Sequence, residues 1–204
     1  MKYYALMLAV ICVSVFLLQL SFPVITDEFV LISKDVLSRS WILVTSMFLH
    51  STEDSFHIYK NMFALVLFGL VLENIIGSRR FLIIFFITGI TASIGAAFFY
   101  PASLGASGAV MGIIGTLAIL RPKMIIYFWV PLPMIVLAAF WALIDLGGMY
   151  YEVSDIAHAA HLFGLGAGIA IGLRLRERFA ARAKPKKGVL REKDIDRWED
   201  EYMK

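Results

Sequence analysis

A serine between glycines has the setting of a nucleophile. Ser107 stands in the run Gly105-Ala106-Ser107-Gly108, immediately before an apolar stretch. Flanking glycines let a substrate or another backbone segment approach closely, and a helix starting here offers unpaired N–H groups and a positive dipole end to a developing oxyanion. The alternative interpretation is a simple N-cap, a role that Ser103 could fill equally well.

A histidine in the last apolar run, His161, could be the base that a serine nucleophile requires. Gly164 and Gly168 follow it on the same helical face, and Gly108 begins a matching pattern of small residues after Ser107. Small residues at four-residue spacing let two membrane helices approach backbone to backbone. If these two faces meet, we expect Ser107 and His161 to lie at the same depth, within hydrogen-bond reach.

An oxyanion also needs hydrogen-bond donors, each of which lowers the barrier by about 3–4 kcal/mol. His57 and Asn61 are spaced i, i+4 and therefore share one face of a helix. Together with the backbone N–H of Ser107, they are the candidate donors. Interhelical hydrogen bonding is the competing explanation for such polar residues within membrane spans.

No carboxylate is expected to orient His161, because Asp155 lies six residues away and near the membrane surface. The sequence therefore predicts a Ser-His dyad without an acid. His158, three residues before His161, is expected to support the site without reacting.

The elements that position these residues are membrane spans. The chain has 204 residues, of which 60% are hydrophobic and 17% charged, whereas soluble domains usually carry about 25% charged residues. A helix needs roughly 20 apolar residues to cross a hydrocarbon core of about 30 Å. The sequence predicts an all-α membrane protein, a bundle of six transmembrane helices without a separate soluble domain, with spans at residues 3–22, 57–76, 81–99, 107–120, 124–144 and 156–173.

The fourth span is too short to cross the membrane. Residues 107–120 would rise only about 21 Å as a helix, so Ser107 would lie roughly 9 Å below the outer boundary. Irregular backbone at that depth must be buried in protein or line a wet cavity, and we expect the loop 100–106 to dip into the bundle. The alternative is a span that starts at Ala102. Pro131 and Pro133 are expected to kink or loosen the fifth span.

The basic residues predict the orientation. They concentrate near residue 2, residues 79–80, residues 121–123 and everything from residue 174 onward. The positive-inside rule then places both termini in the cytoplasm. Residues 23–56 form a long outer loop, and residues 174–204 form a charged cytoplasmic tail with a short helix near Trp198. Residues 3–22 are interpreted as a retained span and not as a signal peptide.

The combined motifs resemble the rhomboid intramembrane serine proteases, over all six spans and the long first outer loop. The motifs that carry the resemblance are His57-x-x-x-Asn61, Gly105-x-Ser107-Gly108 and Ala160-His161-x-x-Gly164-x-x-x-Gly168. The resemblance implies that Ser107 is the nucleophile, that His161 is the base, and that His57 and Asn61 assist the oxyanion hole. It implies hydrolysis of single-span membrane proteins near the outer surface, without a metal or cofactor.

Two residues depart from the pattern of that family. The first loop has Trp41-Ile42 where members often have Trp-Arg, and Met111 stands where a tyrosine commonly stacks on the histidine. Inactive relatives typically lose the serine or the histidine, or place proline before the serine. This chain keeps both and has Ala106.

Two other function classes stay open. One is a non-catalytic rhomboid-like protein that binds membrane helices, and the other is a metal or proton transporter that uses the four histidines. The single cysteine, Cys12, excludes an intramolecular disulfide. The pI near 9.0 reflects membrane topology, so nucleic acid is not an expected partner. The expected location is a prokaryotic plasma membrane, with transmembrane proteins as substrates.

Overall fold

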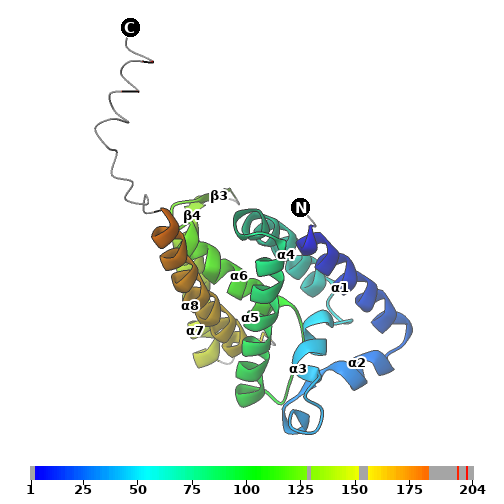
Figure 1. The fold of residues 1–204 in the computed structure, drawn as a ribbon. Helices are drawn as coiled ribbons and strands as arrows, with labels where there is room; N and C mark the ends of the chain where they lie inside the picture. The colour runs from blue at the N-terminus through cyan, green and yellow to red at the C-terminus, as the bar shows by residue number, and fades with distance from the viewer. Residues whose placement is uncertain (1–2, 128–129, 152–155, 184–196, 198–200, 202–204) are drawn as a thin grey trace.

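The protein is a helical bundle, as Figure 1 shows. The computed structural model describes residues 3–127, 130–151, 156–183, 197 and 201. The bundle consists of α1 (Tyr4–Ser21), α4 (Ser55–Ile76), α5 (Ser78–Phe99), α6 (Ser107–Leu120), α7 (Met134–Tyr151) and α8 (His158–Ala183). The connections contain α2 (Val24–Phe29), β1 (Leu31–Ile32), η1 (Ser33–Asp35), α3 (Ile42–Thr45), η2 (Ser46–Phe48), β2 (Ala102–Ser103), β3 (Ile125–Tyr127) and β4 (Pro131–Pro133).

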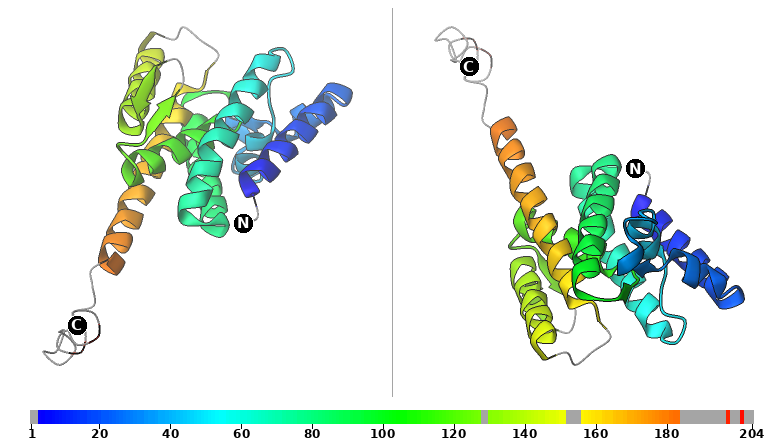
Figure 2. Two further views of the ribbon diagram at one scale, coloured as in Figure 1. Left: turned by 90° about the horizontal axis from the view of Figure 1, so that it is seen from above. Right: turned by 90° about the horizontal axis from the view of Figure 1, so that it is seen from below.

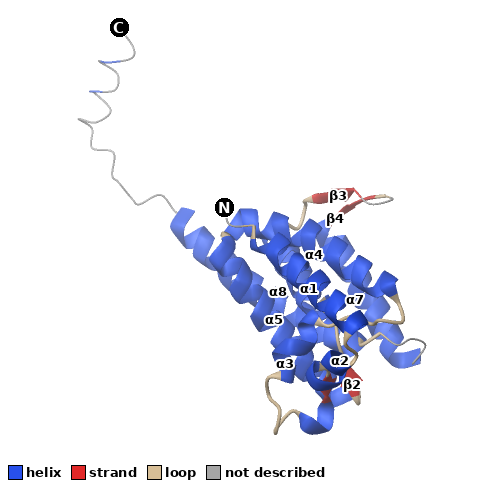
Figure 3. Cartoon of the chain, turned by 90° about the vertical axis from the view of Figure 1, so that its right-hand side faces the viewer, coloured by secondary structure: helices blue, strands red, loops and turns tan. Residues whose placement is uncertain are grey.

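The bundle is built for a membrane, and the predicted all-α membrane fold is confirmed. In α1, α4, α5 and the 158–177 part of α8, the helix is long and apolar enough to cross a bilayer, whereas α6 and α7 are shorter apolar helices. The first turn of α1 and the last turn of α8 lie at the same end of the bundle (Figures 1 and 3). An even number of crossings requires this arrangement.

The central element is α6, whose side chains are buried from Gly108 to Ala118. Its backbone touches that of α8: a Cβ on Gly164 would lie 2.0 Å from the Gly108 carbonyl oxygen, and one on Gly168 would lie 2.0 Å from that of Gly112. Any side chain at these positions would push the two helices apart. The predicted meeting of the two glycine faces is therefore observed.

A carboxylate joins α1 to the rest of the bundle. Glu73 of α4 is 2% exposed and accepts the backbone N–H of Tyr4 at 2.9 Å and that of Ala5 at 3.0 Å. These are first-turn donors that have no partner within their own helix. Close packing beside them, where a Cβ on Gly69 would lie 2.9 Å from Ala5 Cβ, completes the contact between α1 and α4.

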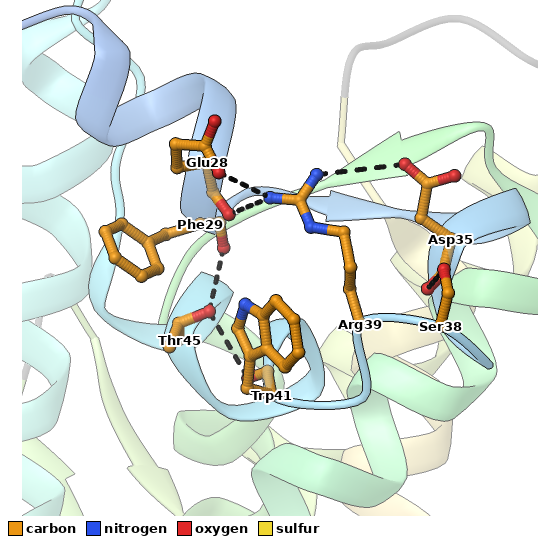
Figure 4. Close-up of polar contacts among 7 residues, drawn as sticks. All are labelled: Glu28, Phe29, Asp35, Ser38, Arg39, Trp41 and Thr45. Atoms are coloured by element: carbon orange, nitrogen blue, oxygen red, sulfur yellow. Dashed lines mark hydrogen bonds and ion pairs between the residues drawn. The ribbon is translucent and has the colours of Figure 1, made fainter.

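The outer segment between α1 and α4 is held by an arginine (Figure 4). The Arg39 guanidinium lies between the Glu28 and Asp35 carboxylates, at 3.3 and 3.9 Å, and also bonds the Glu28 carbonyl oxygen. Its Cζ lies 5.9 Å from the centre of the Trp41 ring. Arg39 thus supplies a cation beside the tryptophan, although Ile42 occupies the position where the resembled family often has arginine.

A glutamine near the C-terminal end of α1 fixes the segment that leads into α4. Gln19 is 1% exposed. Its amide accepts the His50 N–H at 3.0 Å and donates to the His50 carbonyl oxygen at 3.0 Å and to Thr26 Oγ1 at 2.9 Å. Both backbone groups of His50 are therefore satisfied by one side chain, which sets the position of the residues that follow.

The expected fifth span, residues 124–144, is wrong at its beginning. Residues Ile125–Tyr127 and Pro131–Pro133 form an antiparallel hairpin, with Ile125 opposite Pro133. Proline cannot donate the N–H that a helix interior needs, so α7 begins only at Met134. The helix consequently extends to Tyr151, beyond the predicted end.

The last helix is longer than the predicted span. It runs to Ala183, so residues 174–183 continue α8 and are not a separate tail. Figure 2 shows these final turns extending past the other helices. The short helix expected around Leu190, Ile195 and Trp198 lies outside the described residues.

The backbone contact between α6 and α8 predicts different effects of alanine substitution at two nearby glycines of α8. Gly168→Ala introduces a Cβ 2.0 Å from a carbonyl oxygen, so we expect a loss of about 1–3 kcal/mol in stability. Gly166 has no atom within 4 Å of such a Cβ, and Gly166→Ala should be neutral or stabilising by less than about 1 kcal/mol. Thermal unfolding in detergent measures both, and equal effects would contradict the proposed packing.

His50 predicts a loss of stability in acid. Burial lowers its pKa from 6.5 to about 4, with a smaller contribution from His57, and neither ring nitrogen has a hydrogen-bond partner among the described residues. His50 of the unfolded chain binds a proton more tightly than His50 of the folded protein. The stability that neutral His50 allows is therefore fully present above about pH 6.5 and is lost as the pH falls toward 4. The shift corresponds to roughly 3 kcal/mol. The free energy of unfolding, measured from pH 7 to pH 4, should fall less steeply with decreasing pH for His50→Leu than for wild type. An equal pH dependence of the two proteins would contradict this prediction.

Candidate active site

Ser107 is the first residue of α6, and its side chain is partly buried. The residue that precedes the helix is Ala106, and no side chain caps this terminus. The simple N-cap interpretation of Ser107 is therefore not what the structure shows. Ser107 borders a small cavity of about 20 Å³ that Ser46, Ser93 and Ser103 also line. A polar space of that size can hold one water molecule.

The loop before Ser107 is tied to the outer segment. Ser103 of β2 pairs with Leu31 of β1, and the Gly105 N–H donates to the Ser46 carbonyl oxygen at 2.9 Å. The Ser33 N–H donates to the Pro101 carbonyl oxygen at 3.0 Å. The protein thus supplies partners for irregular backbone, as it must wherever lipid excludes water.

Gly105 brings His57 and Ser107 together. Its φ of +119° is a conformation that favours glycine. A Cβ at this position would lie 3.1 Å from His57 Cε1, 3.2 Å from His57 Nε2 and 3.9 Å from Ser107 Oγ. The imidazole and the hydroxyl therefore adjoin the same empty space, which a larger residue would fill.

The protonation of His57 follows from its other nitrogen. His57 Nδ1 accepts the Ser51 N–H at 3.3 Å, so the proton of the neutral ring is on Nε2. That N–H is the one beside Gly105. Gln19 of α1 fixes His50, the residue before Ser51. Gln19 thereby helps to hold the Ser51 N–H that orients the His57 ring.

Asn61 lies one turn further along α4 and is 6% exposed. Its Nδ2 donates to the His57 carbonyl oxygen at 3.0 Å, which uses one of the two amide hydrogens. Its Oδ1 is buried and has no hydrogen-bond partner among the described residues. The second amide hydrogen remains available for another acceptor.

The structure brings the beginning of α8 to the end of α6 that carries Ser107, although no hydrogen bond joins Ser107 and His161 among the described residues. Their sequence neighbours meet there: a Cβ on Gly108 would lie 3.5 Å from the Ala160 carbonyl oxygen. Ala160 also lines the cavity beside Ser107. His161 remains partly accessible, with 15% of its side chain exposed.

The expectation that no carboxylate accompanies His161 is wrong. Asp145 Oδ1 lies 3.0 Å from His161 Nδ1 and 2.8 Å from His158 Nδ1, and the aspartate side chain is 2% exposed. Asp145 was missed because a helix over 124–144 places it in the following loop. The signal that could have found it is the pair Pro131 and Pro133, which delays the helix.

These three residues also form the one group of potential metal ligands within the described part of the chain. The ligand atoms of Asp145, His158 and His161 lie within 4.8 Å of one another. Both Nδ1 atoms lie at hydrogen-bond distance from a single carboxylate oxygen, however. Two N–H donors on one acceptor account for this geometry.

Met111, the other departure from the resembled family, is 5% exposed and packs in the bundle core. The methionine is accommodated one turn after Ser107 on α6. The bundle therefore tolerates this substitution within the helix that carries the candidate nucleophile.

Comparison with known proteins identifies the family. A model of the rhomboid domain matches residues 37–178. Rhomboid protein 1, mitochondrial, of Saccharomyces cerevisiae is 29% identical over 158 residues, which cover 72% of this chain and 45% of that protein. Rhomboid protease GluP of Bacillus subtilis is 35% identical over 150 residues, 70% of this chain and 28% of that protein. RHOMBOID-like protein 6, mitochondrial, of Arabidopsis thaliana is 38% identical over 82 residues, 39% of this chain and 26% of that protein.

The chain spans less than half the length of each of these three relatives. The domain match nevertheless covers most of the chain, including α4 to α7 and the candidate site. On this evidence the chain belongs to the rhomboid family.

Proposed function

We propose that this chain is an active serine endopeptidase, which hydrolyses peptide bonds in or near the transmembrane segments of other membrane proteins. Ser107 is the nucleophile and His161 the general base. The observation that carries the proposal is the contact between the backbones of α6 and α8. The carbonyl oxygen of Gly108, next to Ser107, occupies the space that a Cβ on Gly164 would need. This contact holds the serine and histidine helices in fixed register.

The chemistry follows from the two side chains. His161 Nδ1 is occupied by a carboxylate, which leaves Nε2 to accept the Ser107 proton as Oγ attacks the scissile carbonyl carbon. The same proton then goes to the leaving amine as the C–N bond breaks, giving an acyl-serine. Water, deprotonated by His161, hydrolyses this ester and regenerates the hydroxyl. No metal or cofactor takes part in this sequence.

The oxyanion is stabilised by donors from two helices. The Ser107 N–H is a first-turn donor of α6 without a partner in its own helix, and His57 Nε2–H lies beside Gly105. Asn61 supplies a third candidate through its remaining amide hydrogen. Preorganised donors of this kind stabilise charge that develops in the transition state.

The substrates are membrane proteins that reach the site from the lipid. The excess of basic residues beside the first turn of α1, the α4–α5 turn and the end of α6 supports a cytoplasmic position for that end of the bundle, by the positive-inside rule. Ser107 then lies toward the opposite face. Cleavage near the outer membrane surface follows from this orientation.

The nucleophile and base predict loss of activity upon substitution. Ser107→Ala should abolish fluorophosphonate labelling and lower cleavage of a single-span substrate by about a thousandfold or more, and His161→Ala should lower it nearly as much. Ser14→Ala, at an exposed serine on α1, is the matched control and should cleave like wild type. Purified variants in proteoliposomes provide the measurement. Undiminished cleavage by Ser107→Ala would end the protease assignment, and a wild-type protein that is neither labelled nor able to cleave would favour the non-catalytic, helix-binding alternative.

The oxyanion hole predicts a selective effect on turnover. His57→Ala and Asn61→Ala should each lower kcat by about 10²–10³-fold while KM changes little, because these donors act on charge that forms only in the transition state. Asn74→Ala, at an exposed position of the same helix, provides the comparison. Steady-state cleavage of the same substrate separates kcat from KM. A wild-type kcat for both variants would remove these side chains from the oxyanion hole.

A further inference from the structure

A buried carboxylate on α7 lies within hydrogen-bond distance of both histidines at the beginning of α8. Asp145 Oδ1 lies 2.8 Å from His158 Nδ1 and 3.0 Å from His161 Nδ1. Gly148, three residues later on the same face of α7, makes room for the His158 ring, since a Cβ there would lie 2.2 Å from His158 Nε2. The helix surface is thus shaped around this group.

We propose that Asp145 is a positioning residue for His161, which it holds through Nδ1. This inference rests on the proposed function. A carboxylate that accepts the Nδ1–H of a histidine keeps Nε2 unprotonated and aims it at the hydroxyl. Its negative charge also stabilises the imidazolium that forms when His161 takes the Ser107 proton.

His158 holds the carboxylate in place from a second side. It is 7% exposed and donates to the oxygen that His161 also uses. With two donors on Oδ1, rotation of the Asp145 side chain would break two hydrogen bonds at once. The second oxygen, Oδ2, is buried and has no hydrogen-bond partner among the described residues.

The ionisable groups around His161 come from several helices. His158 accompanies it on α8 and Asp145 faces it from α7. His57 of α4 lies beside Gly105, next to Ser107. The Tyr100 hydroxyl, at the end of α5, accepts the Ala159 N–H at 3.0 Å. Within the described residues, the ion pairs of Asp145 are those with the two histidines.

Two substitutions of Asp145 separate its charge from its geometry. Asp145→Asn keeps an oxygen acceptor and removes the charge, so kcat should fall about tenfold or more at unchanged KM. The acidic limb of the pH–rate profile should move to lower pH by about one unit, because the imidazolium loses its counter-charge. Asp145→Leu removes both and should lower kcat about a hundredfold or more. Asp27→Asn, at an exposed acid on α2, should match wild type.

The experiment is cleavage of the single-span substrate by the full chain in proteoliposomes from pH 5 to pH 9, with thermal unfolding recorded for each variant. Wild-type kcat and an unshifted profile for Asp145→Asn, with Ser107→Ala inactive, would overturn the role of Asp145 but leave the protease assignment standing. The contrary outcome is that cleavage is lost after dialysis against a chelator, returns when Zn²⁺ is added, and fails to return with Zn²⁺ in Asp145→Asn. That result would make Asp145, His158 and His161 metal ligands and would equally overturn the proposal. Full activity after chelation is the expected result.

Discussion

The contact between the backbones of α6 and α8 is the constraint on which the rest of the structure depends. Lipid tails are as apolar as leucine, so membrane helices gain little from hiding apolar side chains from each other. Close packing and polar contacts must hold them together. Gly164 and Gly168 allow carbonyl oxygens of α6 to approach α8 directly, and Thr116 Oγ1 adds a hydrogen bond to the Gly168 carbonyl oxygen at 3.0 Å. The relative depth of the serine and histidine helices is set by these atoms.

Much of this arrangement could be predicted from local sequence signals. The fourth helix begins at Ser107 and ends at Leu120, as expected, because Gly105 interrupts the chain before it and Arg121-Pro122 ends it. The glycine spacing after His161 predicted one partner of this helix, α8. His57 and Asn61 share a face of α4 because a helical period of 3.6 residues places them there.

The features that were missed depend on pairings between distant segments. The hairpin of β3 and β4 shifts the start of α7 by ten residues relative to the expected span, and this shift moves Asp145 from a loop into a helix beside His161. Hydropathy could not reveal it, because residues 124–133 are nearly as apolar as the helix that follows. Arg39 was missed for a similar reason, since its partners Glu28 and Asp35 come together only when the outer segment folds.

The Glu73 carboxylate has a consequence for the limits of the domain. The family match begins at residue 37 and so leaves out α1, but it includes the acid that accepts the Tyr4 and Ala5 N–H groups. A shortened chain that begins at the domain boundary would leave the Glu73 carboxylate, in the last turn of α4, without these two donors. An unsatisfied carboxylate is costly in an apolar environment. The first helix is therefore an integral part of the folding unit, and any shortened chain has to retain it.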